Sequence, residues 1–115
     1  MSDPVHQSIA QLSAKLDAGE IDAEALTRAF IERAEGVGRA LNCYVTLCKD
    51  TALAEARAAA ERAAAKRRRG KLDGIPIALK DNIDVAGVPT SNGFGGTPYR
   101  VPAEDAEMEP EAISR

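Results

Sequence analysis

The spacing of apolar residues predicts two amphipathic helices at the start of the chain. In the first, apolar residues recur at intervals of four, three and four, which places them on one face of an α-helix: Val5, Ile9, Leu12 and Leu16. Asp3 followed by Pro4 is a typical start for this helix, and Gly19 is a typical stop.

The second helix is predicted to follow Asp22, whose carboxylate can accept hydrogen bonds from N–H groups of the first turn. Ile21 before this cap and Leu26 after it occupy the two positions of a hydrophobic staple. We expect the helix to end at residues 36–38, Gly-Val-Gly. The next apolar run, residues 41–47, is rich in β-branched and aromatic side chains and predicts a short strand.

A third helix is predicted from Asp50 or Thr51 to about Arg69, with Gly70 at its end. One of its faces carries only small side chains, which allow close approach of a neighbouring element: Ala52, Ala56, Ala59, Ala60 and Ala63. The basic run at its end, residues 66–69, fits either a phosphate contact or solvated cations at the negative end of the helix dipole. We favour solvated cations, because the run occupies the last turn.

The amino-acid composition changes after Gly70, where glycine and proline become frequent. Five of the nine glycines and five of the six prolines lie between Gly74 and Pro110. Residues 75–80 still form an apolar run, which predicts a strand whose early proline suits a strand start or a sheet edge. The residues from 81 to 99 are rich in turn formers and poor in bulky side chains.

Composition limits the core that this chain can build. Hydrophobic residues make up 44% of the chain, but 22 of them are alanines, and Leu, Ile, Val and Phe together supply only 20%. Such a share is close to the range of disordered chains. We therefore expect marginal stability and a fold that depends on further sequence or on a partner.

Charge and hydropathy argue against two classes of function, nucleic-acid binding and membrane insertion. Fifteen basic and eighteen acidic residues give a net charge of −3 and a pI near 5.2, which argues against direct binding of nucleic acid. No apolar run reaches the roughly 20 residues of a membrane span, and the N-terminus lacks the pattern of a secretory signal. We expect a cytoplasmic protein that makes no membrane contact.

The two cysteines do not form a recognisable metal or redox pair. Cys43 and Cys48 are five residues apart, so on a strand their side chains would point to opposite faces. This spacing is neither a CxxC motif nor half of a zinc site. We expect two small buried or half-buried side chains, and no metal.

Lys80 is the strongest candidate for a catalytic residue. It ends the predicted strand at 75–80, on the face that it shares with Ala78, and Asp81 and Asn82 follow it directly. A lysine that is partly removed from water can accept a proton near neutral pH. The alternative is a lysine whose stem lies along the strand while its ammonium group stays in water.

The sequence around this lysine resembles a known family. Residues 72–91, Leu-Asp-Gly-Ile-Pro-Ile-Ala-Leu-Lys-Asp-Asn-Ile-Asp-Val-Ala-Gly-Val-Pro-Thr-Ser, are similar to the first motif block of the amidase signature family. That family includes bacterial amidases and the A subunit of glutamyl-tRNA(Gln) amidotransferase. The resemblance implies an α/β fold with a mixed sheet covered by helices, of which residues 1–107 would form the N-terminal part. Residues 108–115 diverge, and we expect a disordered tail there.

The resemblance also implies a mechanism. Lys80 would be the lysine of a Ser–cis-Ser–Lys triad that hydrolyses a small-molecule carboxamide through an acyl-enzyme, with no metal or organic cofactor. Asp81 and Asn82 would support Lys80 through hydrogen bonds, although both are also ordinary turn formers after a strand. A further group of polar residues would line the substrate side: Thr90, Ser91, Asn92 and Gly93.

Neither serine of such a triad is found in these 115 residues. In the family both lie in a downstream Gly/Ser-rich segment, whereas the serines here belong to the first-helix region, the lysine block or the C-terminus: Ser2, Ser8, Ser13, Ser91 and Ser114. We therefore expect no amidase activity from this polypeptide alone.

Three functions stay open at this point. The chain can belong to a free amidase, completed by the remainder of the amidase domain. It can belong to the A chain of the amidotransferase, which would imply tRNA and partner subunits. It can also be a non-catalytic fragment that docks on a partner through its Ala-rich helix.

Overall fold

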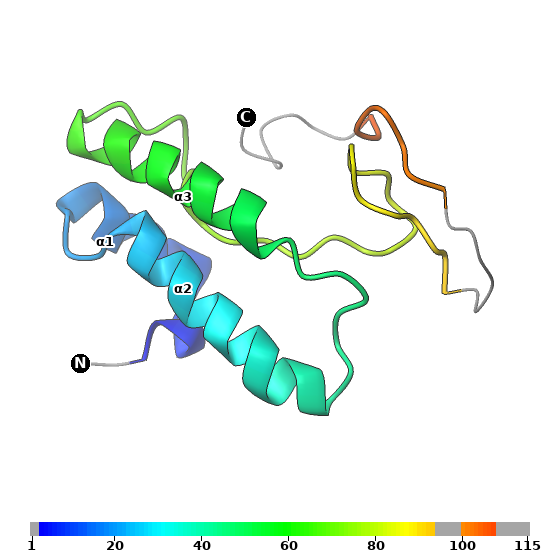
Figure 1. Ribbon diagram of the computed structural model, residues 1–115. Helices are drawn as coiled ribbons and strands as arrows, with labels where there is room; N and C mark the ends of the chain where they lie inside the picture. The colour runs from blue at the N-terminus through cyan, green and yellow to red at the C-terminus, as the bar shows by residue number, and fades with distance from the viewer. Residues whose placement is uncertain (1–2, 94–99, 108–115) are drawn as a thin grey trace.

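The computed structural model describes residues 3–93 and 100–107, and the elements in these ranges are helical. In chain order they are the 3₁₀ turn η1 (Pro4–His6), α1 (Ile9–Ala18), α2 (Ala23–Arg33), the π-helical turn η2 (Ala34–Gly38) and α3 (Lys49–Ala64). Figure 1 shows α1, α2 and α3 gathered on one side, with residues 80–93 and 100–107 forming a loop region beside them.

The first predicted helix is divided in two by its capping residues. Asp3 caps the short turn η1 by accepting a hydrogen bond from the Val5 N–H group at 3.2 Å. Ser8 then caps α1 in a reciprocal capping box, in which Ser8 Oγ accepts from the Gln11 N–H and Gln11 Oε1 accepts from the Ser8 N–H. Gly19 ends α1 in the left-handed conformation, as predicted.

The cap and the staple predicted for α2 are both confirmed. Asp22 accepts a hydrogen bond from the Ala25 N–H group at 3.0 Å. Leu26 is fully buried, and Ile21 packs against the same apolar cluster. The regular helix ends at Arg33, and η2 carries the chain on to the glycine pair where the helix was expected to stop.

Helix α3 is shorter than predicted, because it ends at Ala64 and not near Arg69. Lys66 has a φ of 59°, a left-handed conformation that cannot continue a helix. The alanine face is buried at Ala56 and Ala59, where α3 packs against α2. At these two positions the small-residue face is used inside the chain, whereas Ala52, Ala60 and Ala63 are half-buried.

The core is small and sits where the three helices meet. Its buried members come from α1, α2, α3 and the segment after α3: Leu12, Leu16, Ala23, Leu26, Ala59 and Ile75. The radius of gyration is 15.0 Å, whereas a compact domain of this length would have about 13 Å. The described residues of the loop region contribute none of the buried members of this core.

The two predicted strands are not formed among the described residues. Residues 41–47 are exposed throughout, with Leu41 at 70% and Val45 at 69%. Residues 75–80 are also irregular, and the described β pairing consists of isolated bridges between Val85 and Val88 and between Thr90 and Arg100. A strand needs a neighbouring strand for its backbone hydrogen bonds, and the described chain offers none here. The sheet of the expected α/β fold is thus not confirmed.

The expectation for the cysteines was wrong in one respect. Cys43 and Cys48 are free thiols, but both are exposed and neither is half-buried. Their burial was predicted because cysteine is a small apolar residue in an apolar run, and the described residues contain no element that covers this segment. No helix in the described ranges is long and apolar enough to cross a membrane. The tail predicted at 108–115 lies outside the described residues.

Candidate functional site

Two residues of the basic run after α3, Arg68 and Arg69, belong to an ion-pair cluster around the buried Asp73. The side chain of Asp73 is only 2% exposed, and Arg62 from α3 donates to both of its carboxylate oxygens, at 2.9 and 2.6 Å. The Arg69 N–H group donates to the same carboxylate at 3.0 Å. This bidentate arrangement fixes the segment that follows α3 against the helix itself.

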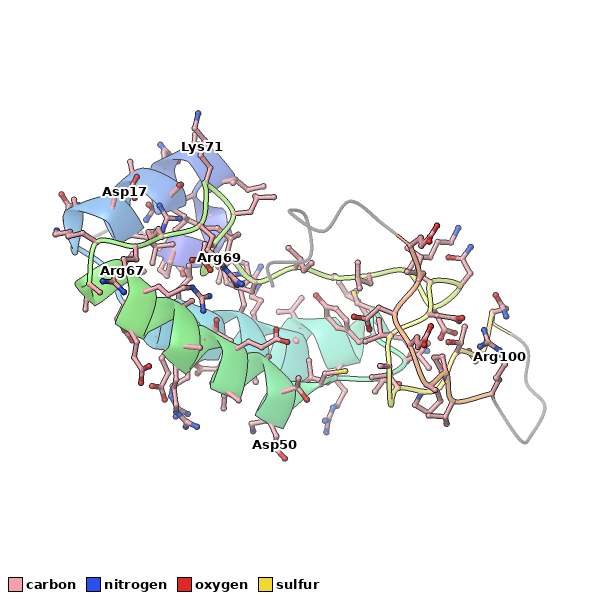
Figure 2. All side chains as sticks on the ribbon, turned by 90° about the horizontal axis from the view of Figure 1, so that it is seen from above. Asp17, Asp50, Arg67, Arg69, Lys71 and Arg100 are labelled. Carbon is pink, nitrogen blue, oxygen red and sulfur yellow. The ribbon has the colours of Figure 1, made fainter. Side chains whose placement is uncertain are left out.

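Arg68 makes further contacts in this cluster, so the expectation of a solvated cation was wrong at this residue. Lys66, Arg67 and Arg69 are exposed, as expected. The side chain of Arg68 is 8% exposed and donates to the Asp73 carbonyl, to Ser13 in α1 and to the Asp17 carboxylate. Figure 2 shows Asp17, Arg67, Arg69 and Lys71 at one end of the molecule and Arg100 at the opposite end. Arg68 therefore ties α1 to the segment after α3, a structural role that the sequence did not reveal.

The pKa of Asp73 reflects this environment. Hydrogen bonding to the Arg62 guanidinium, aided by the Arg69 N–H group, lowers the pKa from 3.8 to about 2 in spite of the opposing effect of burial. Asp73 is thus a stable anion at neutral pH. A carboxylate so fully occupied by guanidinium and amide donors is suited to holding the fold and not to transferring protons.

Lys80 lies at the start of the loop region, seven residues beyond Asp73. It is exposed, so the expectation of a lysine partly removed from water is not met among the described residues. Its carbonyl accepts a hydrogen bond from the Ile83 N–H group at 3.0 Å in a turn that follows it. Within residues 3–93 and 100–107 its amino group has no hydrogen-bond or ion-pair partner. Asn82 is likewise exposed.

Asp81 contacts the far side of the loop and not Lys80. Its Oδ1 accepts from the Ser91 N–H group at 3.0 Å, and its Oδ2 accepts from Ser91 Oγ and, at 3.4 Å, from the Gly93 N–H group. These bonds, led by that of the Ser91 hydroxyl, lower the pKa of the Asp81 carboxyl. The structure therefore brings the Asp81 carboxylate together with Ser91 and Gly93, two of the predicted substrate-side residues.

Thr90 belongs to a neighbouring cluster around Asp84. Its hydroxyl donates to Asp84 Oδ1 at 3.1 Å, and the Arg100 guanidinium donates to the same oxygen. Hydrogen bonding to Arg100, and then to Thr90, lowers the pKa of the Asp84 carboxyl. Thr90 and Ser91 are both 7% exposed, so their side chains are held inside the loop region.

Two aspartates of this loop were missed by sequence reasoning. Asp84 accepts from Thr90 six residues later, and Asp105 accepts from the Ala86 N–H group at 2.9 Å. Their signal was the recurrence of aspartates among turn formers, which favours side-chain to backbone bonds but does not name the partner. No group of three potential metal-ligating side chains occurs in the described part of the chain.

The sequence of this chain matches a known protein family and several of its members. The Amidase family model matches residues 25–109, which include Lys80 and every polar contact of the loop region. The chain is similar to a protein of Acidothermus cellulolyticus described as the A subunit of glutamyl-tRNA(Gln) amidotransferase, with 38% identity over 108 residues. That match covers 94% of this chain and 21% of the relative.

Further relatives carry the same description. The protein of Chloroflexus aurantiacus strain J-10-fl is 43% identical over 93 residues, which cover 81% of this chain and 19% of the relative. The protein of Methylococcus capsulatus is 45% identical over 87 residues, which cover 76% of this chain and 18% of the relative. The chain thus spans about a fifth of the length of these relatives. No solved structure gives a significant match.

Proposed function

Because the chain belongs to the Amidase family, we propose that it forms the lysine-bearing part of an amidase that converts a carboxamide to a carboxylate and ammonia. Lys80 would be the proton acceptor of the catalytic triad. The observation that carries this proposal is the position of Lys80 inside the matched region, with an amino group left without a partner among the described residues.

The contacts of Asp81 favour this role for Lys80. A carboxylate facing the ammonium would hold it in the charged form, which cannot accept a proton. Instead, both oxygens of Asp81 face the turn at 91–93. The nearest acidic neighbour of Lys80 in sequence is thereby engaged elsewhere, and the lysine is available to the serines of a complete site.

The proposed reaction proceeds in two stages. A serine oxygen attacks the amide carbon and gives its proton to a second serine, which passes its own proton to the Lys80 amine. For this step the complete site would have to hold Lys80 in the neutral form. The tetrahedral intermediate then collapses, the C–N bond breaks, and the departing nitrogen takes the proton and leaves as ammonia. Water repeats the sequence on the acyl-enzyme, which releases the carboxylate and restores the serine.

The 115-residue polypeptide alone should hydrolyse no carboxamide. The serines it contains occupy the first-helix region, the loop at 91 and the C-terminal residues, and Ser91 already donates its hydroxyl proton to Asp81. Without a nucleophile and oxyanion donors most of the rate gain of such an enzyme is lost. Ammonia release from glutamine, acetamide or benzamide by the purified polypeptide, abolished in Lys80→Ala, would contradict this.

The role of Lys80 is tested in a complete enzyme, made by joining residues 1–107 to the remaining four-fifths of the Acidothermus cellulolyticus relative. Lys80→Ala should lower kcat by about 10²–10⁴-fold with KM little changed. Lys80→Arg should be nearly as damaging, because a guanidinium stays protonated and cannot accept a proton. Lys71→Arg, at another exposed lysine, is the matched control. A Lys80→Arg enzyme that kept most of its kcat would reduce Lys80 to a structural cation.

A second candidate function is favoured by the names of the relatives. The proteins described above are all A subunits of glutamyl-tRNA(Gln) amidotransferase. In that case the amide nitrogen would be transferred to glutamyl-tRNA(Gln), and partner subunits would be required. The complete enzyme is assayed with and without the companion subunits of the same relative. Amide transfer to glutamyl-tRNA(Gln) that requires them supports the second function, whereas ammonia release that does not require them supports the first.

A further inference from the structure

We propose that Asp81 is a positioning residue, which fixes the turn at Ser91–Gly93 beside the lysine-bearing segment. The proposal deepens the proposed function, on which its catalytic part rests. It assigns Asp81 a role different from the one expected from sequence, since Asp81 acts on the substrate-side turn and does not hydrogen-bond to Lys80.

Four hydrogen bonds connect this one residue to the turn. The carboxylate accepts from the Ser91 N–H group, the Ser91 hydroxyl and the Gly93 N–H group, and the Asp81 carbonyl accepts from the Asn92 N–H group at 3.3 Å. A carboxylate can accept about four such bonds, so most of its capacity is used here. Every residue of the turn is thus held by Asp81.

The backbone of the turn needs such support. Asn92 has a φ of 55° and Gly93 a φ of 79°, so two consecutive residues adopt the left-handed conformation. This conformation costs free energy for a residue other than glycine, less for asparagine than for most, and surrounding contacts stabilise it. The hydrogen bonds from the two residues that flank Asn92 to Asp81 supply that stabilisation.

The connection also joins the turn to the candidate base. Asp81 is covalently next to Lys80, so a turn held by Asp81 is held at a fixed place relative to the Lys80 backbone. Asp81 would thereby preserve the spacing between the proton acceptor and the polar residues that face the substrate. Loss of this link should change substrate binding more than the chemical step.

The structural part is tested on the 115-residue chain by amide hydrogen exchange. Asp81→Asn should speed exchange at Ser91 and Gly93 about tenfold or more, while α1, α2 and α3 keep their rates. Asp105→Asn is the matched control, because it removes the same charge and weakens a backbone bond to Ala86 in the same loop. It should leave Ser91 and Gly93 unchanged within about twofold. Unchanged exchange in Asp81→Asn would overturn the proposal.

The catalytic part is tested in the complete enzyme described above. Asp81→Asn should raise KM about tenfold with kcat within roughly threefold, and Ser91→Ala should give a smaller rise because both amide bonds to Asp81 remain. An unchanged KM, or an equal loss in kcat, would refute the positioning role. If Lys80→Ala stays active while Asp81→Asn still loosens the turn, the proposed function fails and the role of Asp81 in the turn stands.

Discussion

Asp73 shows how one residue can stabilise several elements at once. Its carboxylate binds Arg62 of α3, its carbonyl binds Arg68, and Arg68 reaches Ser13 and Asp17 of α1. Breaking a buried pair leaves an uncompensated charge, which costs more than the pair itself contributes. The cluster therefore acts as a clamp between α1, α3 and the segment that leads to Lys80.

The pKa of Asp73 predicts an acid-dependent loss of stability. A carboxyl whose pKa is lower in the folded state stabilises the fold above its unfolded value, near 3.8. That stability is lost as the pH falls through its folded value of about 2. The contribution is about 2 kcal/mol. Denaturant melts between pH 5 and pH 2 should show this loss in the wild-type chain, whereas Asp73→Asn should lack it.

Asp73→Asn should also unfold more easily at neutral pH, by roughly 2–4 kcal/mol, because Arg62 loses its anionic partner. The matched control is Glu35→Gln. Glu35 also pairs with a cation, Lys49, but both side chains are exposed, at 39% and 49%, and such pairs contribute about 0–1 kcal/mol. Equal destabilisation by the two variants would show that burial of the Asp73 pair is unimportant.

At the level of elements, the helices could be predicted because their signals are local. Asp22 caps the helix that it directly precedes, and Gly19 ends the helix that it directly follows. The strand predictions at 41–47 and 75–80 failed in this structure because a strand depends on a partner elsewhere in the chain. The end of α3 was misjudged because the charges at 66–69 suited a helix terminus, while Asp73, which Arg68 and Arg69 contact, lies beyond it.

The candidate site was predictable only as a set of residues. Lys80 and Asp81 could be selected from their order after an apolar run, and Ser91 from its place in the motif block. The hydrogen bonds from Ser91 to Asp81 span ten residues and depend on how the intervening loop folds back. Residue order does not encode that path, so the prediction that Asp81 supports Lys80 named the residue without its contacts.

At Gly74, between α3 and the loop region, both the backbone conformation and the packing require a glycine. Its φ is +92°, and an added Cβ would lie 3.2 Å from Ala23 Cβ and 3.4 Å from a Leu16 methyl group. Gly74→Ala should therefore destabilise the chain by about 2–3 kcal/mol, through strain and overpacking together. Gly19→Ala, at a φ of +73° with nothing within 4 Å of its Cβ, should cost only about 1 kcal/mol. If the two variants shift the urea midpoint equally, overpacking does not contribute to the destabilisation by Gly74→Ala.

At the scale of the whole molecule, stability is concentrated in the first two-thirds of the chain. Every residue of the core cluster lies between Leu12 and Ile75, and so does the Asp73 clamp. The loop region is held by its own hydrogen bonds around Asp81 and Asp84. Figure 1 shows the same division, with the helices on one side and the loop region beside them.

This division predicts that a polypeptide of residues 1–76 is about as stable as the whole chain. Such a truncation keeps all core residues and the complete clamp, so its thermal midpoint should lie within about 5 °C of that of the 115-residue chain. Truncation after Lys71 should instead abolish cooperative unfolding, because it removes Asp73 and the buried Ile75 from a core with little reserve. Circular dichroism melts of the three polypeptides provide the measurement. If the 1–76 polypeptide melts far below the full chain, the loop region stabilises the helices, and the two parts fold as one cooperative unit.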